Sequence, residues 1–256
     1  MMDETFKRTA VIASQERLTE DVYSMWLKER EIASSAKPGQ FLSLYCKSGN
    51  RLLPRPISIC ETDGDNGTLR LVYRVVGKGT EEFAGLKTGD TLEILGPLGN
   101  GFHMEGHKAI LIGGGIGIPP MLELAKQLKG EKQIVLGYRD MTFLEKEFEA
   151  YGSVYISTED GSRGTKGNVI DAIKAAGLDG DIIYACGPGP MLRGVKAFAT
   201  ERGMKAQLSL EERMACGIGA CLACVCQSKE KDHHTNVKNK RICKDGPVFY
   251  ADEIEL

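Results

Sequence analysis

The stretch "KAILIGGGIGIPPMLELAKQLKG", residues 108 to 130, decides how the middle of the chain folds. It opens with a continuous apolar run that ends in glycine, which is typical of a buried strand. Its second half places apolar residues at helical spacing and again ends in glycine, as helices often do. A strand, a glycine loop and a helix in this order predict one unit of a parallel sheet covered by helices.

The same alternation continues to about residue 205. We expect strands and helices in turn at "KQIVLGYR", "FLEKEFEAYG", "SVYISTED", "NVIDAIKAAG", "DIIYACGPG" and "MLRGVKAFATERG". The pattern predicts an α/β nucleotide-binding domain over residues 105–205, with a parallel sheet and helices on both faces.

The first 104 residues are typical of short strands instead. Valine, isoleucine, leucine and tyrosine are frequent, and glycine, proline, aspartate and asparagine separate the runs. Six short strands joined by turns predict a small closed antiparallel β-barrel, with one helix at "TEEFAGL". The strands are expected at "TAVIASQERL", "VYSMWLKE", "QFLSLYCK", "RPISICET", "TLRLVYRVVG" and "TLEILG".

The last part of the chain, residues 206–256, holds five of the eight cysteines and has no apolar periodicity. Such a segment cannot build much of a core by itself and needs a staple. We therefore expect three domains: the barrel over residues 1–104, the α/β domain over 105–205 and a metal-binding domain over 206–256.

The composition excludes several classes of protein. Of the 256 residues 42% are hydrophobic and 27% charged, as in an ordinary soluble protein. A net charge of −2 gives no basic surplus for nucleic acid or an anionic membrane. The start of the chain has no long apolar run, and no stretch approaches the roughly 20 apolar residues of a spanning helix. A cytoplasmic protein is expected, in which clustered cysteines bind metal or do redox chemistry.

Four of those cysteines lie within "ACGIGACLACVC", residues 215 to 226. Cys216, Cys221 and Cys224 give C-x4-C-x2-C, and Cys243 follows after eighteen further residues. This is the plant-type spacing for a [2Fe–2S] cluster, whose fourth ligand arrives from a distance. Structural zinc is the alternative, but zinc sites usually pair two C-x2-C motifs.

Other residues of this stretch fit the same interpretation. Gly217 and Gly219 permit the tight loop that brings the first two thiolates together. Cys226 is left over, and we expect it to be an ordinary small residue because four ligands are already supplied. A cluster passes single electrons, so the rest of the chain should hold a donor or acceptor.

Two motifs in the barrel suit a flavin nucleotide. In "RPISIC", residues 55 to 60, Arg55 can hold a pyrophosphate, Pro56 fixes the backbone beside it and Ser58 can reach a flavin edge. In "GKGTEEF", residues 77 to 83, Gly79 and Thr80 precede the predicted helix, whose start favours phosphate. An Arg-Pro pair alone is more often a surface turn, so this motif is weak by itself.

Two glycine motifs lie in the α/β domain. Gly113, Gly114, Gly115 and Gly117 let phosphates approach the backbone at a helix start, although the run does not complete G-x-G-x-x-G. A plain strand-to-helix turn is the alternative. The second motif, "YACGPGPM", residues 184 to 191, ends the last long strand, where a cysteine is usually a small buried residue.

Together these motifs resemble the ferredoxin–NADP reductase superfamily. With the cysteine set, essentially all 256 residues resemble the electron-transfer subunits of NAD-dependent dihydroorotate dehydrogenases. The resemblance implies that Cys186 lies near the nicotinamide, where hydride crosses to the flavin. It implies FAD contacts from Arg55, Pro56, Ile57, Ser58, Val72, Tyr73, Arg74, Gly79 and Thr80, and NAD contacts from Gly113, Gly114, Gly115, Gly117, Cys186, Gly187 and Pro188.

Tyr73 is expected to pack on a ring system with Arg74 alongside. NAD is favoured over NADP, because Asp140, Glu159 and Asp160 outnumber Arg163 near the expected ribose site.

The resemblance also implies a function and a partner. An FMN-containing catalytic subunit would oxidise dihydroorotate and pass electrons through the [2Fe–2S] cluster and FAD to NAD⁺, in pyrimidine biosynthesis. FAD exchanges both single electrons and hydride, so the order is cluster, FAD, nicotinamide. The assembly resembled is a heterotetramer with two subunits of each kind.

Two other functions stay open at this point. One is the related FAD and [2Fe–2S] subunit of a ferredoxin–NADP transhydrogenase or sulfide dehydrogenase complex. The other is a redox-sensing binding module without enzymatic activity. His103, His107, His233 and His234 are scattered and are expected to be surface residues rather than metal ligands.

Overall fold

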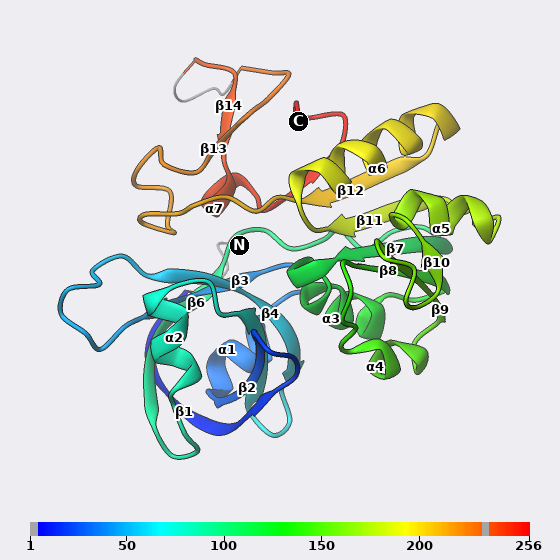
Figure 1. Ribbon diagram of the computed structural model, residues 1–256. Helices are drawn as coiled ribbons and strands as arrows, with labels where there is room; N and C mark the ends of the chain where they lie inside the picture. Colours follow the sequence, from blue (N-terminus) through cyan, green and yellow to red (C-terminus); the bar gives the residue numbers. More distant parts are fainter. Residues whose placement is uncertain (1–4, 232–235) are drawn as a thin grey trace.

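The computed structural model describes residues 5–231 and 236–256, and they form three connected parts (Figure 1). A barrel is followed by a sheet with helices on both faces, and the C-terminal segment lies across both. His103 and His107 are exposed, as expected, whereas His233 and His234 lie outside the described residues. None of the described helices has the length and apolar character needed to cross a bilayer.

The N-terminal part is the predicted closed antiparallel barrel. Its strand order is β1-β2-β5-β4-β3-β6. Along β3, Leu42 and Leu44 point into the barrel core, whereas Phe41 belongs to a core on the outside of the barrel. The strands are β1 (Phe6–Arg17), β2 (Val22–Lys28), β3 (Phe41–Tyr45), β4 (Arg55–Asp63), β5 (Thr68–Arg74) and β6 (Thr91–Leu98).

Two helices accompany the barrel, where one was expected. The expected helix is α2 (Lys78–Ala84). The other is α1 (Arg30–Ser35), which begins where the Glu29 carboxylate accepts a hydrogen bond from the backbone N–H of Ile32 at 2.6 Å. A helix of 6 residues with two buried is too short to show helical periodicity, so sequence patterns could not reveal α1.

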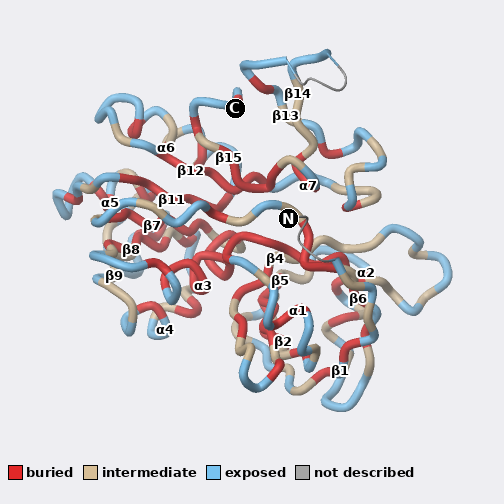
Figure 2. The backbone as a smooth tube through the Cα atoms, turned by 180° about the vertical axis from the view of Figure 1, so that it is seen from behind, coloured by how far each residue is buried: buried red, intermediate tan, exposed pale blue. Residues whose placement is uncertain are grey.

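The second part is a seven-stranded sheet with the order β10-β9-β8-β7-β11-β12-β15. Its central strands are buried along their length (Figure 2). All pairings are parallel except that of β12 with β15. The strands are β7 (Lys108–Gly114), β8 (Glu131–Tyr138), β9 (Ser153–Thr158), β10 (Thr165–Lys166), β11 (Ile182–Cys186), β12 (Lys205–Ser209) and β15 (Val248–Tyr250).

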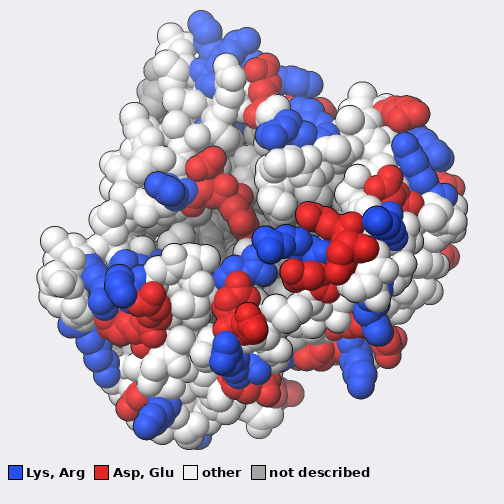
Figure 3. Space-filling model, in the orientation of Figure 1, with Lys and Arg blue, Asp and Glu red and all other residues white. Residues whose placement is uncertain are grey.

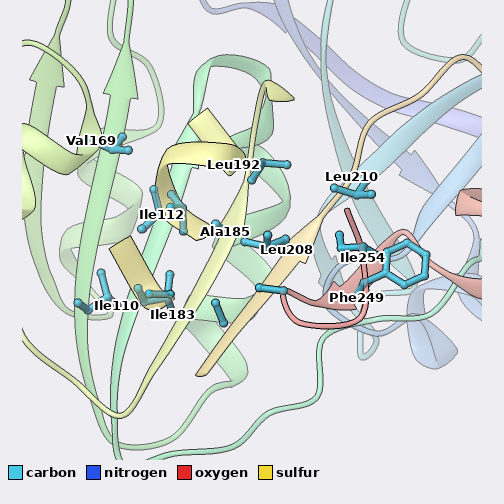
Figure 4. Packing of buried hydrophobic residues seen from close by; sticks show 14 of the residues in the cluster. Ile110, Ile112, Val169, Ile183, Ala185, Leu192, Leu208, Leu210, Phe249 and Ile254 are labelled. Carbon is cyan, nitrogen blue, oxygen red and sulfur yellow. The ribbon is translucent and has the colours of Figure 1, made fainter. Parts of the chain in front are cut away.

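Helices cover both faces of this sheet, as predicted. On one face α5 and α6 pack against alternate residues of β7 and β11 (Figure 4). On the other face α3 and α4 pack against the residues between them. The elements are η1 (Gly115–Gly117), α3 (Pro119–Gln127), α4 (Glu145–Glu149), α5 (Val169–Ala175) and α6 (Gly189–Arg202).

The C-terminal segment is joined to the sheet at both of its ends. It leaves from β12, forms β13 (Val225–Gln227), β14 (Asn239–Arg241) and α7 (Ile242–Asp245), and returns as β15 beside β12. The expected boundary at residue 205 therefore falls on the first residue of a sheet strand. We propose that the cluster-binding domain begins after β12.

A buried contact fixes the barrel to the sheet. The Glu123 carboxylate on α3 is 2% exposed and accepts a hydrogen bond from the backbone N–H of Thr62 at 2.6 Å. Lys126, one turn later, donates to the carbonyl of Thr62 at 2.9 Å. Two side chains of α3 thus bond the backbone N–H and the carbonyl of one β4 residue, much as a neighbouring strand would.

Acidic and basic side chains are mixed over the face of the molecule seen in Figure 3.

Candidate functional site

The four predicted cluster ligands come together as two pairs of cysteines. Cys221 Sγ lies 3.3 Å from Cys216 Sγ. Cys243 lies beside Cys224, whose Sγ accepts a hydrogen bond from the Cys243 backbone N–H at 3.4 Å. Within residues 5–231 and 236–256, no three cysteine, histidine, aspartate or glutamate side chains converge on a single metal position. A [2Fe–2S] cluster takes two thiolates on each iron, so two pairs of cysteines fit it.

Backbone amides point at these sulfurs from a loop with two left-handed glycines. Gly217 has a φ of +71° and Gly219 a φ of +80°, a conformation that side chains rarely adopt. The N–H of Gly219 donates to Cys243 Sγ at 3.1 Å, and the N–H of Cys221 donates to Cys216 Sγ at 3.4 Å. Such donors stabilise a thiolate and tune a cluster bound to it.

The pKa values of the thiols reflect these surroundings. Burial raises the pKa of Cys216, but backbone donors including Ile218 and Cys221 outweigh it and lower the pKa to about 6. Burial and the neighbouring Cys224 raise the pKa of Cys243 to about 12. Iron binds the thiolate, so assembling a cluster requires Cys243 to release a proton at neutral pH.

Cys243 is held in place by contacts to other parts of the chain. Its neighbour Ile242 donates a backbone hydrogen bond to the carbonyl of Cys224 at 2.8 Å. The turn after α7 is anchored to the barrel, because the backbone N–H of Asn100 donates to the carbonyl of Gly246 at 2.6 Å. The segment that carries Cys243, the predicted distal ligand, is therefore fixed both to Cys224 and to the barrel.

Cys226 lies outside the two pairs. It sits on β13 opposite Lys240 of β14. Burial raises its pKa. It packs against the apolar core that contains Cys224 and Cys243, and its role as an ordinary small residue stays a prediction.

The cluster loop packs against the outer wall of the barrel. A Cβ at Gly217 would lie 2.7 Å from Ser43 Oγ of β3 and 3.8 Å from Leu98 of β6. Phe41 and Leu98 also share one apolar core with Cys224 and Cys243. The barrel wall thus forms one side of the cluster site.

The two flavin motifs of the barrel meet at Arg55 and Gly79. A Cβ at Gly79 would lie 2.1 Å from Arg55 Nε and 2.6 Å from its Cζ, so the guanidinium lies directly over this glycine. Arg55 also donates to the carbonyl of Leu53 and is only half-buried. A guanidinium kept accessible over a glycine backbone suits a pyrophosphate, as expected for FAD.

The neighbouring motif residues have different roles. Ser58 and Ile57 on β4 are half-buried and accessible to a cofactor. The Thr80 hydroxyl accepts the backbone N–H groups of Val76 and Gly77, at 2.9 and 3.2 Å, and donates to the carbonyl of Gly77. Thr80 therefore closes the turn before α2, and its hydroxyl is already occupied.

The expectation that the Tyr73 ring packs on a flavin is wrong. The ring is 1% exposed and lies inside the barrel, stacked on Tyr23, and its hydroxyl donates to Gln15 at 3.1 Å. Because the side chain of Tyr73 points into the barrel, a cofactor on the outside could contact only its backbone. Arg74 lies 2.9 Å from Asp21, and Val72 belongs to the core between barrel and sheet.

The Arg55→Ala variant is expected to hold FAD less tightly while keeping its cluster. The substitution removes a charge-assisted contact worth roughly 1.5–3 kcal/mol, equivalent to about a tenfold to hundredfold loss of affinity. FAD titration of the apoflavoprotein measures the change, and Arg30→Ala on α1 serves as the matched control. Equal FAD affinity in the two variants would show that Arg55 is only a turn residue.

The two glycine motifs of the sheet also meet. A Cβ at Gly117 would lie 2.5 Å from the carbonyl oxygen of Cys186 and 2.6 Å from Gly187 Cα. A Cβ at Gly114 would lie 2.4 Å from Met191 Sδ and 3.2 Å from Pro188. The backbones of β7 and β11 thus converge at their carboxyl ends, which is where ligands bind in open α/β sheets.

Cys186 is buried at this edge, between Gly113 of β7 and Ser209 of β12. Burial, with a further contribution from Glu211, raises the pKa of its thiol, so it stays protonated. The sequence analysis did not select Glu211. Its side chain is exposed, yet the surrounding protein desolvates its carboxyl and raises its pKa, against the effect of Arg74. The one sequence signal for Glu211 is its position two residues after the end of β12.

A groove of about 680 Å³ lies near the same edge, between α5 and α6. Its lining carries three carboxylates, from Glu159, Asp171 and Glu201, against one cation, Lys174. Arg163 is ion-paired with Glu145 and does not line the groove.

Comparison with known proteins identifies the family. The model of the "oxidoreductase FAD-binding domain" matches residues 9–103. The model of the "iron-sulfur cluster binding domain of dihydroorotate dehydrogenase B" matches residues 211–255. The electron transfer subunit of dihydroorotate dehydrogenase B (NAD(+)) from Bacillus caldolyticus is 45% identical, over 96% of this chain and 97% of that subunit.

The chain belongs to the electron transfer subunits of dihydroorotate dehydrogenase B. Another member, from Listeria monocytogenes, is 46% identical over 96% of this chain and 97% of its own. Among solved structures, the NADH-dependent reduced ferredoxin-NADP oxidoreductase matches with a TM-score of 0.87 and 30% identity, over 96% of this chain and 89% of that one. Flavohemoglobin from Malassezia yamatoensis, at 22% identity and a TM-score of 0.64 over 77% and 57%, shares the fold alone.

Proposed function

We propose that this chain carries electrons from an FMN-containing catalytic subunit, which oxidises dihydroorotate, to NAD⁺. Cys216, Cys221, Cys224 and Cys243 would hold the [2Fe–2S] cluster. The Arg55–Ser58 strand with Gly79 would hold FAD, and the glycine loop of residues 113–117 with Cys186–Pro188 would hold NAD. Pyrimidine biosynthesis, which consumes the product of dihydroorotate oxidation, is the setting.

The order of the barrel strands carries this proposal. The three proposed sites adjoin the consecutive strands β5, β4 and β3, which supports a row of sites. The glycine loop lies next to β5, and Val72 of β5 shares a core with Ile118. Arg55 and Ser58 lie on β4. The cluster loop packs on β3 through Ser43. The flavin motif therefore lies between the nicotinamide motif and the cluster ligands.

The bound groups supply the redox chemistry, because FAD exchanges hydride with nicotinamide and single electrons with the cluster. The residues of the chain position these groups. Arg55 neutralises pyrophosphate charge, and Gly117 lets the nucleotide loop approach the end of β11 closely. The contact from Glu123 to Thr62 fixes the helix that follows the glycine loop against the strand of the flavin motif.

The groove between α5 and α6 supports NAD rather than NADP. We place the adenosine ribose there, because the groove lies near the carboxyl ends of β9 and β11. Three carboxylates in its lining would repel a 2′-phosphate, and Lys174 alone does not balance them.

The partner is expected to cover the cluster loop. Ile218 and Leu222 flank the ligands and are 53% and 61% exposed, which suits contact with another protein. The relatives are named electron transfer subunits, which supports a catalytic partner subunit. We propose that this partner carries FMN and that the assembly is a heterotetramer with two subunits of each kind. We propose that the complex works in the cytoplasm.

Cofactor analysis and reconstitution test this function together. The anaerobically purified protein is expected to contain one FAD, two irons and two inorganic sulfides per chain, with a rhombic EPR signal after reduction. With the FMN-containing partner it should reduce NAD⁺ on addition of dihydroorotate, and either subunit alone should not. Zinc in place of iron would overturn the cluster assignment, and NAD⁺ reduction driven by reduced ferredoxin instead would favour the transhydrogenase alternative.

A further inference from the structure

Ser43 is a buried polar residue on the barrel strand β3. It is 1% exposed, and its hydroxyl has no hydrogen-bond partner in the part of the chain that the structure describes. A buried hydroxyl that lacks a partner costs stability, and buried polar groups in proteins are nearly always bonded. The site therefore calls for an acceptor or donor that protein atoms do not provide.

The position of Ser43 indicates where that partner lies. Ser43 Oγ is 2.7 Å from where a Cβ would stand on Gly217, the residue directly after the ligand Cys216. The same strand places Phe41 in the core that contains Cys224 and Cys243. The side chains of Phe41 and Ser43 share one face of β3, because residues two apart on a strand point the same way. The hydroxyl is therefore directed from the barrel wall toward the cluster loop.

We infer that the Ser43 hydroxyl donates a hydrogen bond to a sulfur of the bound [2Fe–2S] cluster. The inference rests on the proposed ligand set. The cluster's sulfurs carry negative charge and accept hydrogen bonds, and the loop already directs the amide of Gly219 at Cys243 Sγ. A sulfur of the cluster would be a hydrogen-bond acceptor at this position, where the described protein atoms supply none.

The hydrogen bond has a redox consequence. Reduction adds one negative charge to the cluster, so a donor stabilises the reduced form more than the oxidised form. Ser43 therefore raises the reduction potential of the cluster. Ser43 also pairs with Pro56 of β4, so the same residue joins the strand of the flavin motif to the cluster loop.

The Ser43→Ala variant tests the inference. Its cluster is expected to show a reduction potential lower by about 59 mV, which is a tenfold change in the one-electron equilibrium. An EPR-monitored redox titration of the holoprotein measures it. Ser157→Ala is the matched control, because Ser157 Oγ is equally buried and unpartnered in the described chain but lies on β9, across the sheet. Its cluster potential should equal that of the wild type.

Pulsed EPR of the reduced cluster in H₂O and in D₂O is a second measurement. The amide protons directed at the sulfurs, such as that of Gly219, exchange in both proteins, so the wild type should show one exchangeable coupling more than a cluster-loaded Ser43→Ala protein. Wild-type potential and proton couplings in a cluster-loaded Ser43→Ala protein would overturn the inference. A wild-type protein without a [2Fe–2S] signal would instead overturn the proposed function.

Discussion

The Cys243→Ser variant is expected to lose its [2Fe–2S] cluster or hold it in a severely altered form, whereas Cys226→Ser should keep the wild-type cluster. Cys243 lies beside Cys224 and receives the amide hydrogen bond of Gly219, while Cys226 sits on β13 opposite Lys240. Fe–S clusters select soft thiolates, and a serine hydroxyl is a poor replacement. Iron, sulfide and EPR measurements on the two anaerobically purified proteins decide the matter. A cluster that survives in Cys243→Ser but not in Cys226→Ser would reassign the fourth ligand.

The Cys243→Ser variant also separates electron transfer between NADH and FAD from electron transfer through the cluster. Cys243→Ser should still reduce a small dye with NADH, because the residues proposed to hold FAD and NAD lie in the barrel and in the sheet domain. It should fail to reduce NAD⁺ with dihydroorotate and the partner subunit. Deleting residues 206–256 is a poorer test, since it would also remove β12 and β15 from the sheet. Full coupled activity in a protein shown to lack the cluster would remove the cluster from the path.

The Gly117→Ala variant is expected to lose NAD⁺ reduction by roughly fivefold to 150-fold while it retains FAD and the cluster. Its Cβ would stand 2.5 Å from the carbonyl oxygen of Cys186 and 2.6 Å from Gly187 Cα. These are backbone atoms of a buried strand end, so relief requires the nucleotide loop to move. Overpacking of this kind costs about 1–3 kcal/mol. NADH–dye kinetics and NAD titration of the flavoprotein measure the loss.

The matched control is Gly85→Ala at the end of α2, where the nearest atom to a Cβ lies 3.5 Å away. That variant should reduce the dye at the wild-type rate. Wild-type NAD affinity and turnover in Gly117→Ala would mean that the close approach of β7 and β11 has no part in nucleotide binding. A loss of FAD in the same protein would point to a general disturbance of the fold.

Local patterns in the sequence predicted much of the architecture. The barrel strands and the alternating sheet were visible because strand and helix periodicities are local. The C-x4-C-x2-C spacing predicted the ligand set because the loop between the thiolates is short. The structure agrees with these predictions in the barrel and the sheet. The ligand set stays a prediction, which the two cysteine pairs fit.

Features that depend on contacts between distant segments were not predictable. The inward direction of the Tyr73 ring is not one of these features, because Leu69 and Leu71 share its face of β5 whereas the opposite face carries Arg70 and Arg74, so the alternation already indicated it. The return of the chain as β15 beside β12 joins segments about 40 residues apart. Ser43 and Glu211 belong to no motif, and only the packing of β3 and the end of β12 against other elements draws attention to them.

The neighbouring positions of β12 and β15 bear on how the holoprotein matures. These strands hold the beginning and the end of the cluster-binding segment together through the sheet, so closing that loop requires no metal. The barrel and the sheet can therefore fold first, and the four predicted ligand cysteines then already lie in two pairs when iron is delivered. Removal of iron by a chelator would then unravel only the segment between the two strands, as a separate unit of local unfolding. Iron delivery then becomes a step that can follow the folding of the barrel and the sheet and that can be repeated on the same molecule after the cluster is lost.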